Sequence, residues 1–257
     1  MLMKTIKIRD RHVTYEEMVG EGCGQTLLLV HGAADHSWIW HDAIYGINSR
    51  HRRIAINLPG RLGSDGPPIG CAQDFRTFIT ELVEKMAIER FVFMGHSMGG
   101  SMALDFAVHC GDRLIGFGML GSSPKWEIDA DLVKLLKNDP EKGVKAVNDD
   151  FGLFSSHTVH DVRRKFYFET GSVSAETAAV DLLACTTYQL EDVLETIALP
   201  ALIVCGDEDI GSLPGSRLCA ARIRDVKFVE ISRCGHSLLI EQPKQLTQAL
   251  NNFVDGL

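Results

Sequence analysis

The chain has 257 residues, enough for one domain with a sizeable core, and its 45% hydrophobic and 23% charged residues exclude disordered and fibrous classes. Its formal net charge of −8 argues against a nucleic-acid-binding protein, which needs a basic surface. We also expect no membrane span and no signal peptide, because no apolar run approaches roughly 20 residues and the first residues lack an apolar block.

In chain order, the first predicted elements are two half-exposed strands, at 4–9 and 12–19. Compact apolar runs follow and predict strands at 26–31, 53–57, 91–95, 114–120, 201–205 and 227–231. Several of these runs are apolar on both faces, which is typical of parallel strands covered by helices on each side. Apolar residues at helical spacing predict helices at 75–88, 98–109 and 243–254. This alternation predicts an α/β fold whose mostly parallel sheet is flanked by helices.

The segment from about Pro124 to Thr196 interrupts the alternation, because strand patterns vanish there and helical patterns replace them. Pro140 suits a helix start and Ser174 suits an N-cap. The expected helices are 129–138, 140–150, 159–169 and 174–196. The predicted organisation is a core of residues 1–123 and 197–257, with a helical cap inserted at 124–196.

The run Gly95-His96-Ser97-Met98-Gly99 lies between a predicted strand and a predicted helix. In that context the G-x-S-x-G spacing predicts a nucleophile elbow, a tight and strained turn that exposes the serine hydroxyl. The N-terminus of the following helix favours negative charge that develops there. Ser97 is therefore the candidate nucleophile.

A serine nucleophile needs a base that an acid orients, and in this context both are expected downstream, with the acid before the histidine. A buried strand leads directly into Asp207, Glu208 and Asp209. Of the ten histidines, His236 is the one that follows a late strand end, which makes it the candidate base. The residues alone do not separate the three carboxylates.

With these motifs the chain resembles the α/β-hydrolase superfamily, in its serine-nucleophile branch with a helical cap. Further shared landmarks are His31-Gly32, Leu58-Pro59-Gly60, Gly235-His236 and Glu241-Gln242-Pro243. The resemblance implies Asp209 as the acid, since the family's acid usually lies three residues after the glycine of a Gly-x-x-Asp turn. It also implies an oxyanion hole formed by the backbone N–H groups of Met98 and Ala33.

The chain departs from the family pattern in two places. Asn57 and Leu62 stand where the family commonly has aspartate and glycine, which leaves the shape of that loop open. Ser101 stands where the menaquinone-pathway lyases of this fold usually carry arginine, and His96 stands where carbon–carbon bond hydrolases often carry asparagine. Both differences count against those activities, and a serine at position 97 excludes the aspartate-nucleophile dehalogenases and epoxide hydrolases.

Aromatic residues near the predicted site suggest an apolar substrate pocket. Trp38 follows the oxyanion loop in a stretch that opens a helix, and Trp126 and Phe154 belong to the predicted cap. The alternative role for these residues is packing of the cap on the core. An apolar cap over the serine suits an acyl chain or a compact ester, and no motif indicates phosphate or metal binding.

The sequence thus predicts a carboxylesterase-like serine hydrolase that cleaves a small to medium carboxylic ester through an acyl-enzyme intermediate, without cofactor or metal. The alternatives are an enol-lactonase, a thioesterase or a carbon–carbon bond hydrolase, and a ligand receptor without turnover. The seven cysteines lack Cys-x-x-Cys pairing and suit core thiols, so we expect a cytoplasmic protein. The natural substrate and the oligomeric state do not follow from the sequence.

Overall fold

The computed structural model describes residues 3–257, apart from the side chains at positions 144 and 148–151. Within that range the strands form one sheet, in the order β1-β2-β4-β3-β5-β6-β7-β8. Pairing is antiparallel between β1, β2 and β4, and parallel from β4 through β8. The strands are β1 (Lys4–Ile8), β2 (Arg11–Met18), β3 (Thr26–Val30), β4 (Arg52–Ile56), β5 (Phe91–His96), β6 (Leu114–Leu120), β7 (Ala201–Gly206) and β8 (Val226–Ile231).

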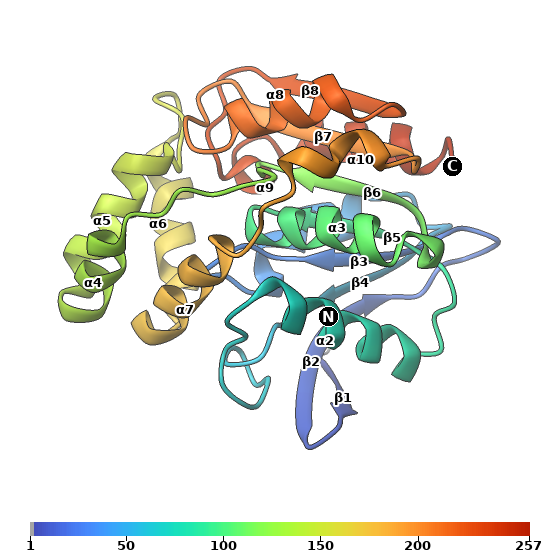
Figure 1. Cartoon of the computed structure of the whole chain (residues 1–257), viewed down its shortest axis with the longest axis horizontal. Helices are drawn as coiled ribbons and strands as arrows, with labels where there is room; N and C mark the ends of the chain where they lie inside the picture. The colour runs from blue at the N-terminus through green and yellow to red at the C-terminus, as the bar shows by residue number, and fades with distance from the viewer. Residues whose placement is uncertain (1–2) are drawn as a thin grey trace.

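Helices cover both faces of the sheet, as the two-sided apolar strands predict (Figure 1). In β5, Phe91 and Phe93 pack in one apolar cluster while Val92 and Met94 pack in the other, on the opposite face. The first cluster lies under α2 (Ala72–Lys85), α3 (Met98–His109) and α8 (Leu213–Arg222). The second lies under α1 (His41–Gly46), α9 (Leu238–Glu241) and α10 (Pro243–Val254).

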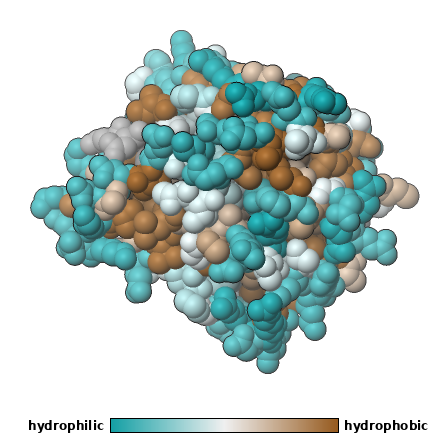
Figure 2. All heavy atoms as spheres, viewed as in Figure 1, coloured by the Kyte–Doolittle hydropathy of each residue, from teal (hydrophilic) through white to brown (hydrophobic). Residues whose placement is uncertain are grey.

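Four further helices lie between β6 and β7 in the chain and gather at one end of the sheet, at the left of Figure 1. They are α4 (Ala130–Asn138), α5 (Pro140–Phe151), α6 (His160–Thr170) and α7 (Ala175–Cys185). Ser174 caps α7 by accepting the N–H of Thr177 at 3.1 Å, as the sequence predicts. Figure 2 shows hydrophobic atoms on the visible face at this end of the molecule. Among the residues of these helices, Tyr167, Phe168 and Leu183 are exposed. The division into a core and a cap stays a prediction.

The prediction of one helix over 174–196 is wrong, because α7 ends at Cys185 and a separate 3₁₀ helix follows at Glu191–Thr196. The hydroxyls of Thr186 and Thr187 donate to the carbonyls of Leu183 and Ala184, at 2.7 and 2.6 Å, and these local bonds compete with continuation of the helix. Gln189 then forms a bridge with Lys125. The helical spacing of apolar residues continues across this break, because the apolar residues on either side of it still face the core. The spacing alone therefore predicts one helix.

Two helices, α8 and α9, have no counterpart in the sequence-based prediction. The buried positions of α8 are the small residues Ser216 and Cys219, so the helix lacks the apolar stripe that reveals a helix in a sequence. The helix α9 is a single turn of four residues. Among the described residues, no helix has both the length and the apolar character needed to cross a membrane.

Candidate active site

Ser97 lies at the turn between β5 and α3, with φ of 52°, a left-handed conformation that costs a non-glycine residue about 1–3 kcal/mol. The neighbouring glycines make the turn possible. A Cβ on Gly95 would lie 1.9 Å from the carbonyl oxygen of Gly99, and a Cβ on Gly99 would lie 2.4 Å from that of Val30. The motif therefore encodes a strand and a helix packed too closely for side chains, and the turn projects the Ser97 side chain outward.

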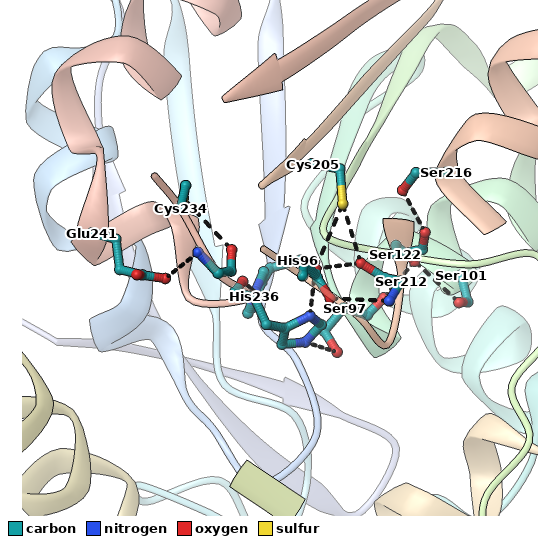
Figure 3. Close-up of polar contacts among 12 residues, drawn as sticks. His96, Ser97, Ser101, Ser122, Cys205, Ser212, Ser216, Cys234, His236 and Glu241 are labelled. Carbon is teal, nitrogen blue, oxygen red and sulfur yellow. Dashed lines mark hydrogen bonds and ion pairs between the residues drawn. The ribbon is translucent and has the colours of Figure 1, made fainter. Parts of the chain in front are cut away.

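His236 links Ser97 to Asp209 through two hydrogen bonds. Figure 3 labels Ser97 and His236, which lie beside each other. Its Nε2 lies 2.9 Å from Ser97 Oγ, and its Nδ1 lies 2.9 Å from Asp209 Oδ2. The three residues follow the carboxyl ends of β5, β7 and β8, which share one edge of the parallel sheet. Residues far apart in the chain thus meet at the site.

Of the three adjacent carboxylates, Asp209 is the one that contacts His236. It is fully buried, and its Oδ1 accepts the N–H of Ser212 at 2.9 Å while the Ser212 hydroxyl donates to Oδ2. Asp207 is exposed and accepts the N–H of Cys234 at 3.2 Å. Glu208 accepts the Ser155 hydroxyl at 2.8 Å. The carboxylate that the resemblance implies as the acid is thus the one that lies beside His236, and its role as the acid stays a prediction.

The surroundings of the pair favour the ionised form of Asp209 and make the imidazole of His236 more basic. Burial alone would raise the pKa of Asp209, but the charge of His236 and hydrogen bonds from His236 and Ser212 lower it below its usual value. Burial alone would lower the pKa of His236, but the charge and hydrogen bond of Asp209 raise it. The nearby His96 is buried without such a partner, and its pKa falls to about 3.

Two backbone N–H groups remain available beside the Ser97 hydroxyl. Within residues 3–257, the N–H groups of Met98 and Ala33 donate no hydrogen bond, whereas the N–H of Ala34 donates to Asp181 at 2.9 Å. The loop that carries Ala33 packs tightly on the elbow, since a Cβ on Gly32 would lie 2.9 Å from the Cβ of Ser97. Ala33 and Ser97 line the same cavity, and the assignment of the Met98 and Ala33 N–H groups to an oxyanion hole stays a prediction.

A cavity of about 420 Å³ opens onto Ser97 and His236. Residues of α4, α5, α6 and α7 form much of its wall. The larger apolar side chains in the lining include Trp126, Ile128, Leu136, Val147, Leu153, Phe166, Val173 and Leu182. A cavity of this size and character suits a small ligand with an apolar part.

Of the three expected pocket residues, the structure places Trp126 in the cavity lining but neither Trp38 nor Phe154. Trp38 packs on the side of α9 and α10, and Lys165 lies over its ring at 5.2 Å from the centroid. Phe154 lies behind the wall, with its ring edge-to-face against Phe166 and Tyr167 at 5.2 and 5.8 Å between centroids. Proximity in sequence to the oxyanion loop or the cap does not determine which way an aromatic ring faces.

Sequence reasoning missed a buried ion pair beside the oxyanion loop. Arg61 donates two hydrogen bonds to Asp181 of α7, both at 2.8 Å, and both side chains are almost fully buried. Asp181 also accepts the N–H of Ala34, so one helical carboxylate orients the loop that carries Ala33. Arg61 follows the Leu58-Pro59-Gly60 landmark, but no local pattern identifies its partner.

Glu241 is a second connection that sequence reasoning missed, although the residue belongs to a quoted landmark. Its Oε1 accepts the N–H of Gly235 at 3.0 Å, and its Oε2 accepts the N–H of Ser155 at 2.8 Å. The N–H of His236 itself donates to the carbonyl of Gly152 at 3.0 Å. The loop that carries His236 is thereby tied to the segment that follows α5.

Comparison with known proteins agrees with this architecture. Residues 27–249 match the model of the alpha/beta hydrolase family. A pimeloyl-[acyl-carrier protein] methyl ester esterase of Nitrosomonas europaea is 23% identical over 245 residues, which cover 90% of this chain and 96% of the relative. Among solved structures, an esterase from Exiguobacterium antarcticum superposes with a TM-score of 0.87 at 18% identity, covering 99% of this chain and 100% of its own. The enol-lactonase from Burkholderia xenovorans superposes with a TM-score of 0.86 at 17% identity, covering 98% of this chain and 100% of its own. The chain belongs to the alpha/beta hydrolase family.

Proposed function

We propose that this protein is a serine hydrolase that cleaves a small to medium carboxylic ester through an acyl-enzyme intermediate. The observation that carries the proposal is the continuous hydrogen-bonded chain from Ser97 through His236 to Asp209, which opens onto an apolar cavity. The family match and the esterase among the relatives support the same reaction class.

In the first half of the proposed reaction, Ser97 Oγ attacks the ester carbonyl carbon and His236 Nε2 takes the hydroxyl proton. Asp209 keeps the proton of His236 on Nδ1 and stabilises the imidazolium that forms. The C–O bond to the alcohol then breaks, and His236 returns the proton to the leaving alkoxide. An ester now joins the acyl group to Ser97.

In the second half, water replaces the alcohol. His236 takes a proton from the water as its oxygen attacks the acyl carbon, and the proton returns to Ser97 when the enzyme ester breaks. The N–H groups of Met98 and Ala33 donate to the negative oxygen in both steps. One such donor lowers the barrier by about 3–4 kcal/mol in comparable enzymes.

The proposal is tested by turnover and by labelling. The purified protein should hydrolyse p-nitrophenyl esters, and a fluorophosphonate probe should modify Ser97 in the peptide map. Ser97→Ala should lose activity by several orders of magnitude, while Ser49→Ala, at an exposed serine of the loop before β4, should match the unaltered protein. A panel of lactones and thioesters of similar size separates the alternatives. A label on another residue, or binding of esters without turnover, would contradict the assignment.

A further inference from the structure

The cavity contains an acidic group that the proposed reaction does not use. Asp35 lies in the oxyanion loop, lines the cavity, and is 2% exposed. Its Oδ1 accepts the N–H of His36 at 2.8 Å. No hydrogen bond from any residue of the described chain reaches its Oδ2.

A carboxylate that is 2% exposed and has one oxygen without a protein donor is unusual, since nearly all buried polar groups have a partner, and the surface that Asp35 keeps faces the cavity it lines. The nearest cation, Arg61, does not supply one. Its guanidinium donates to both oxygens of Asp181 and, at 3.3 Å, to the backbone carbonyl of Asp35 instead of the side chain. A donor for Oδ2 must therefore come from whatever occupies the cavity.

The charges around the cavity point to the kind of group that would bind. The described lining contains two carboxylates, Asp35 and Glu141, and neither lysine nor arginine. The rest of the lining is largely apolar. Such a wall favours a ligand that is mostly apolar and carries one hydroxyl or ammonium donor, and it disfavours an anion.

We propose that Asp35 is a specificity-determining residue, which accepts a hydrogen bond from a hydroxyl or ammonium group of the ester substrate. This inference rests on the proposed function and narrows its substrate class to esters with one polar donor on an otherwise apolar body. A site built around such a bond discriminates against an analogue that lacks the donor, because the carboxylate is then left buried and unpaired.

The protonation of Asp35 supports a pH-dependent version of this preference. Burial raises the pKa of Asp35 to about 7, against the hydrogen bond from His36 and the charge of Arg61, which lower it. The charged and titratable groups around it are Arg61, His36, Glu169 of α6 and Asp181 of α7. Above this pKa the carboxylate accepts from a donor, and below it the protonated acid loses the charge that attracts an ammonium group.

Isomeric esters provide the test, because they differ in the donor and not in size. One matched pair is the p-nitrophenyl ester of ω-hydroxyhexanoic acid and that of ω-methoxypentanoic acid. Shorter and longer pairs, and acetates of ω-hydroxy and ω-methoxy alcohols, cover both sides of the ester. We expect the hydroxy ester to have about tenfold higher kcat/KM than its ether isomer at the best length. A ratio near one at every length in both series would overturn the inference while leaving the serine hydrolase intact.

Asp35→Asn is the informative variant. It keeps the side-chain volume and an oxygen for the N–H of His36, but it replaces the cavity-facing acceptor with an amide donor. The hydroxy-to-ether ratio should fall to one or below, whatever the variant's overall kcat/KM, because the two isomers share every other contact. Asp42→Asn removes an exposed carboxylate at the start of α1 and should leave the ratio unchanged. An equal loss on both isomers in Asp35→Asn would mean a structural role only.

The pH profile and a binding measurement complete the test. The ratio of kcat/KM for an ω-ammonium ester to that for the ω-methoxy ester of the same chain length should rise with pH through about 7 and be flat in Asp35→Asn. The titration of His236 cancels in this ratio, since both esters use the same base. Binding to Ser97→Ala needs no turnover, and 1-hexanol should bind more tightly than its isomer methyl pentyl ether. Equal binding would reject the role of Asp35 even if no ester were hydrolysed.

Discussion

At the scale of single residues, the proposed chemistry depends on which of several similar side chains meets His236. Asp207, Glu208 and Asp209 are consecutive, but the turn after β7 exposes the first and buries the last. Asp209 accepts from His236 and from both the N–H and the hydroxyl of Ser212, so its position is determined by several bonds. Asp207 and Glu208 instead accept hydrogen bonds from Cys234 and Ser155.

Asp209→Asn should therefore lower kcat by about 10⁴-fold, because an amide does not orient the imidazole with its proton on Nδ1. Asp207→Asn should be far milder, since that exposed side chain bonds the N–H of Cys234. Steady-state kinetics on one p-nitrophenyl ester compares the two variants at equal protein stability. A crippled Asp207→Asn enzyme beside an active Asp209→Asn enzyme would refute the acid assignment.

The pH dependence is also a property of single residues. His236 must be neutral to take a proton, so kcat/KM should rise with pH through its pKa, which the carboxylate of Asp209 raises above the ordinary value of 6.5. In Asp209→Asn the inflection should move to lower pH, because burial then acts without the opposing carboxylate. His41→Gln, at an exposed histidine of α1, serves as the control. A profile without inflection from about pH 5 to 9, with chemistry rate-limiting, would contradict a histidine base.

At the scale of elements, α7 and the oxyanion loop form one unit through Asp181. The carboxylate bonds Arg61 and the N–H of Ala34, whose φ of 56° is left-handed. The N–H of Ala34 is bound to Asp181, whereas the N–H of Ala33 donates no hydrogen bond among the described residues, which leaves it free for the oxyanion role that we propose. The helix thus contributes to the site without a side chain on the reacting atoms.

Asp181→Asn should lower the free energy of unfolding by about 3–5 kcal/mol, because it leaves the buried Arg61 guanidinium without a counter-charge. The double variant Arg61→Met/Asp181→Leu should recover most of that stability, since apolar residues of similar volume replace the pair. Urea unfolding gives the stabilities. In the double variant kcat should be lower than in the unaltered protein while KM changes less, because leucine leaves the N–H of Ala34 without an acceptor, whereas the amide oxygen in Asp181→Asn can still accept it. A stable double variant with unchanged kcat would show that Asp181 does not position the loop.

At the scale of the whole molecule, helices α4–α7 wall a bounded cavity over one edge of the sheet. Acyl carbons that enter such a cavity gain about 0.8 kcal/mol per methylene until it is full. A longer chain must then bend or protrude. The cavity of about 420 Å³ therefore limits substrate length.

For p-nitrophenyl esters, kcat/KM should rise about fourfold per methylene over short acyl chains, peak at short to medium length, and fall for long ones. Trp126→Phe should shift the peak, because Trp126 lines the cavity. Trp38→Phe should leave it in place, since that ring packs on the other side of the loop. Initial rates across the acyl series measure both. Faster hydrolysis of palmitoyl than of butyryl ester would show that these helices do not bound the site.

The sequence by itself determined the features that local chemistry encodes. Strand and helix periods predict the α/β sheet, and two glycines that exclude any Cβ mark the strained turn at Ser97. Parallel strands end at one edge of the sheet. This rule selects His236, which follows a late strand, as the candidate base. Short or weakly patterned elements such as α8, and the break after Cys185, did not follow from periodicity alone.

The tertiary structure decided what depends on segments far apart in the chain. Arg61 and Asp181 are 120 residues apart, and their pairing depends on how α7 packs against the loop after β4. The same packing decides that Trp126 lines the cavity while Trp38 does not, and that one oxygen of Asp35 has no donor among the described residues. Such contacts leave no periodic trace in the sequence, because packing constrains volume, charge and direction at single positions and not a repeated pattern.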